Sequence, residues 1–238
     1  MQNVIGHFRT TALKQTFYIL TLILELLSCK SGTVNQADNS IVSKSADNNI
    51  KLHKLEKLFV VGDFDGDRKQ DTIFQHNFSK LTKVEIEYSA DPFQNEWNSV
   101  VKWFYDQDAI IYLTINKSTK DTLYLGTAQG LYCLINLGDN NADGKDEIAI
   151  VIDRLDESRV NSCFIYSFCK NKWTLLKEFG IHEGSFDFVT DKAPIFENIK
   201  DYLEKQNGKW VYKVYSQDGY ENEEDIGKML TLKLDNCE

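Results

Sequence analysis

The chain from residue 57 to residue 235 alternates short apolar segments with polar segments rich in Gly, Asn and Asp. Evenly spaced runs of this kind are typical of antiparallel β-sheets with a turn between successive strands. In residues 83–89 the alternation is strict, because charged residues separate Val84, Ile86 and Tyr88. The predicted strands are residues 57–64, 71–76, 83–89, 109–116, 121–127, 130–138, 147–153, 161–168, 172–179, 209–216 and 229–235.

Two segments show helical periodicity instead. Residues 193–209 carry apolar side chains at helical spacing, with Pro194 near the start and Gly208 beyond the end. Residues 95–107 are the second candidate for a short helix. The apolar face of this second helix would hold Trp97, Val100, Val101 and Phe104. The whole pattern predicts a single, mainly β domain of antiparallel sheets over residues 51–238, with one or two short helices.

The first residues of the chain have a different character. A polar lead-in with Arg9 and Lys14 precedes an apolar run, residues 17–27, that only Glu25 interrupts. A membrane-spanning helix needs about 20 apolar residues, so this shorter run is better matched to the apolar part of a secretory signal peptide. A buried hydrophobic helix is the alternative.

The apolar run ends in the sequence LLSC, residues 26–29, which resembles the signal of bacterial lipoproteins. The resemblance implies that residues 1–28 are removed and that Cys29 carries the lipid that anchors the protein to a membrane. Residue 30 is Lys and not the Asp of the inner-membrane retention signal, which implies the outer membrane of a Gram-negative cell. Residues 29–50 are polar after the cysteine, so we expect them to form a flexible tether.

Two acidic loops repeat 76 residues apart, in residues 63–71 (DFDGDRKQD) and 139–147 (DNNADGKDE). Side chains with oxygen atoms stand at positions 1, 3, 5 and 9 of both loops. Such side chains at alternate positions of a tight loop can converge on one Ca²⁺ ion, to which a position-7 carbonyl adds a further ligand. The candidate ligands at positions 1, 3, 5 and 7 are Asp63, Asp65, Asp67 and the Lys69 carbonyl in the first loop, and Asp139, Asn141, Asp143 and the Lys145 carbonyl in the second.

The residues after the loops exclude an EF-hand, because position 12 is Phe74 or Ile150 in a predicted strand. The pattern instead resembles the calcium loops of FG-GAP/VCBS repeats, which occur in integrin-type β-propellers and in secreted bacterial proteins. Gly144 stands where that family has glycine, whereas the first loop has Arg68 there and its glycine at Gly66. The resemblance implies one or two Ca²⁺ ions, with Asp71 and Glu147 at position 9 as further ligands. Metal-free Asx turns are the alternative.

Two repeats are too few for a regular propeller, so we expect an incomplete propeller-like domain or a sandwich-like one. Four carboxylates within nine residues repel each other unless a cation neutralises them, so cation binding would stabilise the fold.

Four cysteines follow Cys29: Cys133, Cys163, Cys169 and Cys237. Disulfides are compatible with a compartment outside the cytoplasm. Cys163 and Cys169 would share one strand at a separation of about 20 Å, which makes them poor partners. Cys133 could pair with Cys163 or Cys169 across adjacent strands, and buried free thiols are the alternative.

The sequence contains no recognisable catalytic motif. Its histidines (His7, His53, His76 and His182) form no zinc motif, and no G-x-S-x-G sequence is present. The net charge of −9 without a Lys/Arg cluster argues against nucleic acid as a partner. These observations favour a cell-envelope binding domain with a glycan or an envelope protein as partner. An envelope hydrolase acting on glycans is the alternative.

Overall fold

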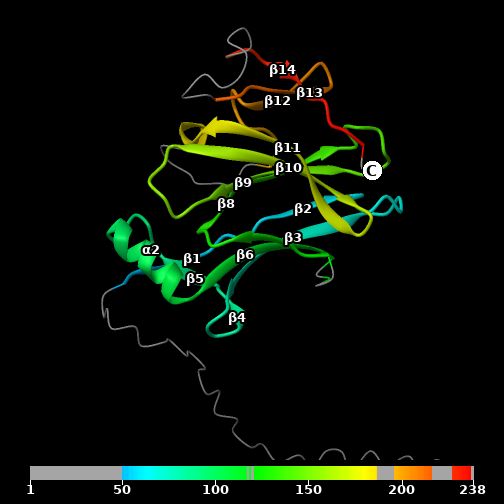
Figure 1. The fold of residues 1–238 in the computed structure, drawn as a ribbon. Coiled ribbons are helices and arrows are strands. Elements are labelled where there is room, and N and C mark those ends of the chain that lie inside the picture. The colour runs from blue at the N-terminus through cyan, green and yellow to red at the C-terminus, as the bar shows by residue number, and fades with distance from the viewer. Residues whose placement is uncertain (1–49, 117, 119–120, 187–195, 216–226, 237–238) are drawn as a thin grey trace, which may run out of the picture. The chain divides into compact units, whose positions relative to one another are not determined.

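Three stacked antiparallel β-sheets form the centre of the domain (Figure 1). The structure is a computed structural model that describes residues 50–116, 118, 121–186, 196–215 and 227–236. The chain divides into two compact units, residues 1–46 and 47–238, and all described residues belong to the second. The predicted signal peptide, Cys29, the tether up to residue 49 and Cys237 lie outside the described residues.

Each sheet is built from strands that are close in sequence. The first sheet has the order β2–β3–β6–β7, with β4 paired to the end of β3. The second has the order β11–β10–β9–β8, the third β12–β13–β14, and β1 pairs with β5. The bounds are β1 (Leu52–Lys54), β2 (Phe59–Gly62), β3 (Asp71–Ser79), β4 (Val84–Glu85), β5 (Tyr88–Ala90), β6 (Ala109–Ile115), β7 (Leu123–Gly126), β8 (Gly130–Gly138), β9 (Glu147–Asp153), β10 (Val160–Cys169), β11 (Lys172–His182), β12 (Leu203–Gln206), β13 (Lys209–Tyr212) and β14 (Leu230–Thr231).

The second sheet is buried on both faces, and the sequence of β9 shows why. Its run EIAIVID is continuously apolar from Ile148 to Ile152, which is typical of a strand covered on two sides. Ile148, Ile150 and Ile152 pack with Ile73 and Leu113 of the first sheet. Its other face, with Ala149 and Val151, packs with Leu203 and Trp210 of the third sheet. The prediction of a mainly β fold is therefore confirmed, and its form is a layered sandwich.

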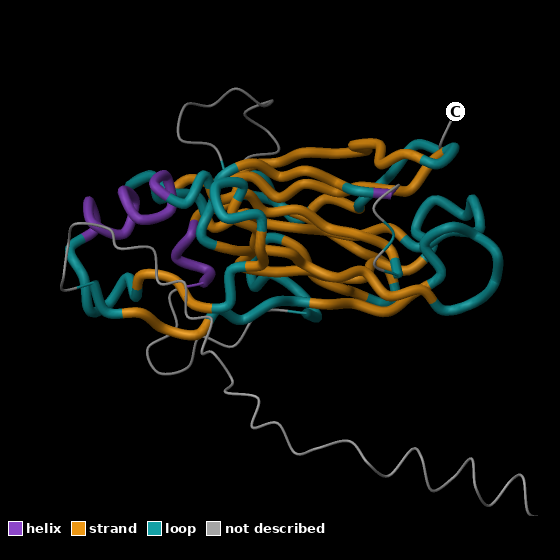
Figure 2. The backbone as a smooth tube through the Cα atoms, turned by 90° about the horizontal axis from the view of Figure 1, so that it is seen from below, coloured by secondary structure: helices purple, strands orange, loops and turns teal. Residues whose placement is uncertain are grey.

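The predicted helix in residues 95–107 is confirmed as α2 (Trp97–Asp106). Val100 and Phe104 are its buried residues, and they pack in a small cluster with Ile86, Ala90 and Ala109. A short 3₁₀ helix, η2 (Glu183–Phe186), follows β11. Among the described residues, no helix has the length and apolar character needed to cross a membrane. Figure 2 shows the strands running between α2 at one end and long loops at the other.

The helix predicted for residues 193–209 is wrong over its described part. Leu203–Gln206 and Lys209–Tyr212 form an antiparallel hairpin, β12–β13, in place of a helix. Its turn residues Asn207 and Gly208 both have positive φ angles, 51° and 78°. Asn-Gly is the preferred pair for such a two-residue turn, so Gly208 belongs to a hairpin turn and does not end a helix.

The alternating strand predicted for residues 83–89 is also wrong. The chain forms two short strands here, and they belong to different sheets: β4 pairs with β3, and β5 pairs with β1. Val84 and Tyr88 are each 57 % exposed, whereas Ile86 is buried. A common face for these three residues therefore does not exist, because the chain changes sheet between them.

The positions of the cysteines contradict the predicted disulfide pairing. Cys133 on β8 and Cys163 on β10 both stand opposite Val151 of β9, which separates the two strands. Both are buried free thiols, so the pairing of Cys133 with Cys163 or Cys169 is wrong. Cys169 is disulfide-bonded.

Candidate metal centres

The two acidic loops share one backbone conformation. Positions 4 and 6 of each loop have positive φ angles: 83° at Gly66 and 65° at Arg68, then 62° at Ala142 and 88° at Gly144. This left-handed conformation favours glycine, and each loop has glycine at only one of the two positions. Arg68 therefore does not change the shape of the first loop, although it departs from the glycine pattern of the resembled family.

The loops also share their internal hydrogen bonds. In each, the backbone N–H groups at positions 2, 6 and 7 donate to the carboxylates at positions 9, 1 and 5. The pairs are Phe64–Asp71 (3.3 Å), Arg68–Asp63 (2.9 Å) and Lys69–Asp67 (2.8 Å) in the first loop, and Asn140–Glu147 (2.9 Å), Gly144–Asp139 (3.0 Å) and Lys145–Asp143 (3.1 Å) in the second. The repeat seen in the sequence is thus a structural repeat.

Each loop gathers three carboxylates. One oxygen from each of Asp139, Asp143 and Glu147 lies within 4.8 Å of the others. The same holds for the first-loop residues, which are Asp63, Asp65 and Asp71. These six were predicted as metal ligands, and the structure brings them together.

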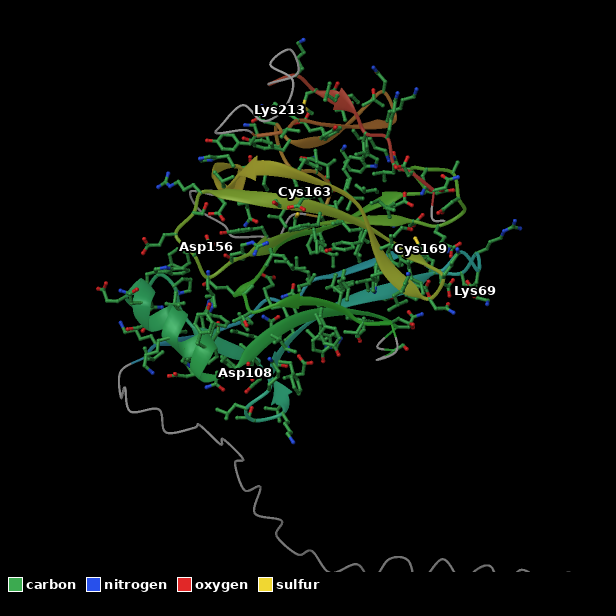
Figure 3. All side chains as sticks on the ribbon, viewed as in Figure 1. Lys69, Asp108, Asp156, Cys163, Cys169 and Lys213 are labelled. Carbon is green, nitrogen blue, oxygen red and sulfur yellow. The ribbon has the colours of Figure 1, made fainter. Side chains whose placement is uncertain are left out.

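The other predicted ligands have different surroundings. Asp67 is not part of the first cluster. Its carboxylate forms an ion pair of 2.7 Å with the ammonium group of Lys69, which Figure 3 labels. The Oδ1 atom of Asn141 accepts from the Asp143 N–H at 3.1 Å. The Lys69 and Lys145 carbonyls stay predictions.

The two loops differ at position 9. Both carboxylate oxygens of Asp71 have donors, the Phe64 N–H at 3.3 Å and the Asn116 side-chain amide at 2.5 Å. Glu147 is 0 % exposed, and its Oε2 accepts from the Asn140 N–H at 2.9 Å. Its Oε1 is buried and has no hydrogen-bond partner.

The surroundings of Glu147 disfavour a negative charge in the absence of a cation. Burial raises the pKa of its carboxyl group to about 7, and the nearby charges of Asp143, Asp139 and Asp146 act in the same direction. A buried carboxylate oxygen without a donor is unfavourable. A cation beside Asp139, Asp143 and Glu147 would satisfy this oxygen and neutralise the cluster, so the residues present fit a metal ion.

The two loops contact each other through Asp146, which the sequence analysis did not identify. The Asp63 N–H donates to Asp146 Oδ2 at 3.1 Å, and the Asp146 N–H donates to the Asp63 carbonyl at 2.8 Å. Asn136 donates to the same Asp146 Oδ2 at 2.8 Å. The equivalent position in the first loop is the exposed Gln70. The repeat alignment therefore offered no signal for this contact.

One histidine lies in an acid–His–hydroxyl arrangement. His76 contacts Glu85 Oε1 through Nδ1 and Thr114 Oγ1 through Nε2, each at 2.9 Å. Lys57 donates to the same carboxylate at 2.9 Å. Thr114 is 2 % exposed, which closes its hydroxyl to a substrate. This row of residues therefore connects β3, β4 and β6.

The outer face of the first sheet is aromatic. We define it by Phe59, Phe74, Tyr112 and Tyr124, which are cross-strand neighbours with His76 among them. The Tyr112 ring stacks on His76 at 4.6 Å and lies 5.8 Å from the Tyr124 ring. Phe59 and Tyr124 are exposed.

Comparison of the sequence and the structure with known protein families, curated proteins and solved structures finds no match.

Proposed function

We propose that this protein is a cell-envelope lipoprotein whose sandwich domain binds an envelope component and is stabilised by Ca²⁺ at the two acidic loops. The observation that carries the Ca²⁺ part of the proposal is the buried, unpartnered Oε1 of Glu147 within a cluster of three carboxylates. An ordinary Asx turn needs no such residue, whereas a cation site does.

The choice of Ca²⁺ follows from the donor atoms. Both carboxylate clusters consist of Asp and Glu only, and hard oxygen donors favour Ca²⁺ or Mg²⁺ over zinc or copper. A loop of flexible geometry with several carboxylates suits Ca²⁺ better than Mg²⁺, which requires a near-ideal octahedron and keeps several water ligands.

A thermal unfolding scan tests the metal. With Ca²⁺ at 100 times the dissociation constant of the second loop, binding at that loop should raise stability by about 2.7 kcal/mol, which is roughly 5–10 °C for a domain of this size. Asp143→Ala should remove most of this rise. Glu56→Ala is the matched control, because Glu56 is an exposed acid outside both loops. A melting temperature that responds to neither Ca²⁺ nor chelator would contradict the proposal.

The aromatic outer face of the first sheet is the binding surface we propose. Exposed rings next to hydrogen-bonding groups can hold a glycan by stacking and by polar contacts. Phe59 and Tyr124 supply exposed rings, and Glu85 and Lys57 supply a carboxylate and an ammonium group at the same face.

Co-sedimentation with insoluble peptidoglycan tests this surface. The double variant Phe59→Ala/Tyr124→Ala should reduce the bound fraction at least tenfold. Tyr88→Ala is the control, because Tyr88 is equally exposed but lies on β5, in a different sheet. Equal retention of both variants would exclude the face. Capture of a discrete envelope protein without peptidoglycan would assign the face to a protein partner instead.

The lipid anchor rests on the sequence alone. Intact mass measurement of the mature protein should find an acylated Cys29 as the N-terminal residue, and Cys29→Ser should release the protein from the membrane fraction. An unmodified Cys29 within a longer chain would contradict the anchor.

A further inference from the structure

We propose that cation binding at the loop of residues 139–147 organises the loop of residues 63–71 through Asp146, so that the two sites bind as a coupled pair. The inference rests on the proposed cation binding and adds to it, because two sites in one domain can also bind independently.

The contact between the loops is reciprocal and involves backbone atoms. Asp63 donates its N–H to Asp146 Oδ2 at 3.1 Å and accepts the Asp146 N–H on its carbonyl at 2.8 Å. Asp63 belongs to the first carboxylate cluster. Asp146 stands directly before Glu147 of the second cluster. The bridge therefore joins the first ligand position of one loop to the residue directly before the last ligand position of the other.

The space around the bridge is tightly filled. Asn136 on β8 donates to both Asp146 Oδ2 (2.8 Å) and the Val61 carbonyl (3.0 Å), which ties β2 to the same carboxylate. A methyl group at Gly62 would lie 2.4 Å from the Asn136 amide nitrogen and 2.5 Å from Asp146 Oδ2. Glycine at position 62 therefore leaves room for the bridge, and a larger residue there would displace the Asn136 amide and the Asp146 carboxylate from their present positions.

The coupling follows from shared ordering. A cation at the second loop fixes Glu147, and with it the neighbouring Asp146, whose two hydrogen bonds then fix the backbone of Asp63. The first loop binds its cation with less ordering left to perform, which is positive cooperativity. By linkage, the first cation favours the second by the same factor.

The two sites should fill in a definite order. Asp71 already has a donor on each oxygen, one of them from Asn116, whereas Glu147 has a free oxygen within its cluster. A cation at the first loop must compete with the Asn116 amide, but at the second loop it completes an unsatisfied group. The second loop thus binds its cation more tightly, and that cation organises the first loop.

Calorimetric titration of the full chain with Ca²⁺, after removal of metal with a chelator, tests the coupling. Asp139→Ala removes the second site and Asp65→Ala the first, so that each remaining site is measured alone. Loss of either site should weaken the other by roughly 5- to 150-fold relative to the stepwise constants of the unaltered protein. Repeating both variants in a Gly62→Ala background should abolish this weakening, since that change breaks the bridge without altering a charge or a ligand.

Two further variants separate the bridge from other effects. Gln70→Ala, at the position equivalent to Asp146, should leave the coupling intact. Asn136→Ala replaces Gly62→Ala if the latter does not fold, because it removes the amide that holds Asp146 and adds no atoms. If each loop kept its Ca²⁺ affinity after loss of the other loop's site, the coupling would be overturned but the proposed cation binding would not. The same conclusion would follow if the unaltered protein bound only one Ca²⁺ ion. Weakening that persists without the bridge would overturn the role of Asp146. Absence of any Ca²⁺ binding would overturn both proposals.

Discussion

The raised pKa of Glu147 makes the stability of the metal-free protein depend on pH. Its carboxyl pKa rises from 4.5 to about 7, first because burial removes the group from water and then because other acids surround it. The metal-free folded protein therefore keeps a proton that the unfolded chain releases between these pH values. Below pH 4.5 the free energy of unfolding equals that expected for a carboxyl group of unshifted pKa. As the pH rises through 7, it falls below that value by up to about 3 kcal/mol.

Glu147→Gln should therefore have opposite effects with and without metal. In chelator at pH 8, the variant should be more stable than the unaltered protein, by up to about 3 kcal/mol, and the difference should shrink toward pH 5. With saturating Ca²⁺ the order should reverse, because the amide removes a ligand charge. Urea unfolding at both pH values, with and without Ca²⁺, checks this. A less stable variant in chelator at pH 8 would contradict the prediction.

The left-handed positions of the loops allow a matched pair of substitutions. Ala142→Gly should stabilise the protein by about 0.5–1 kcal/mol and Gly144→Ala should destabilise it by about 1–2 kcal/mol, because glycine alone adopts a positive φ without strain. A methyl group at Gly144 would meet no atom within 4 Å, so this variant reports backbone strain only. Urea midpoints measured in chelator provide the comparison, and shifts of the same sign would argue against this account.

Among the elements, β11 meets the segment after β13 at a point where no side chain fits. The Tyr215 N–H donates to the Gly180 carbonyl at 2.8 Å, and a methyl group at Gly180 would lie 2.5 Å from the Tyr215 carbonyl oxygen. Gly180→Ala should cost about 1–3 kcal/mol in urea unfolding, as overpacking does. Gly130→Ala on β8 is the control, since its nearest contact would be at 3.7 Å. Equal losses in both variants would reject the proposed clash.

The elements also show what a sequence can predict. The long apolar strands and α2 follow from local periodicity, which is why β8 and β9 lie where the pattern placed them. The predictions for residues 83–89 and 193–209 were wrong because the patterns of these segments are compatible with more than one structure. β4 forms a local hairpin with β3, whereas β5 pairs with β1, a strand more than 30 residues earlier, so the local pattern of residues 83–89 could not show that the two strands join different sheets. The pair Asn207–Gly208 did carry a local hairpin signal, which the helical spacing of the apolar residues outweighed.

The candidate metal sites were also predictable only in part from the sequence. The ligand positions of each loop follow from spacing within nine residues, so the repeat was visible in the sequence. The burial of Glu147, the amide of Asn116 and the bridge at Asp146 depend on segments that meet only in the fold. Their roles therefore required the structure.

At the scale of the whole molecule, the loops and the buried thiols lie in different parts of the sandwich. One acidic loop connects β2 to β3 within the first sheet, and the other connects β8 to β9 within the second sheet. Cys133 and Cys163 lie in the core cluster shared by the second and third sheets. Burial raises the pKa of Cys133 to about 12 and that of Cys163 above its usual value. Their thiolates, the reactive form, are thus scarce in the folded protein.

Thiol labelling should therefore report whether the three layers unfold together. At pH 8, alkylation of Cys133 and Cys163 should require global unfolding, and Ca²⁺ at 100 times its dissociation constant should slow it by about 100-fold through its effect on the unfolding equilibrium. Mass spectrometry of the two alkylated peptides measures both rates, and Asp143→Ala should remove most of the Ca²⁺ effect. If the third sheet separated from the second without global unfolding, both thiols would be labelled at a rate independent of Ca²⁺, because both pack against the third sheet. Equal protection of both thiols would instead mean that a cation at one end of the strands stabilises all three sheets as one cooperative unit.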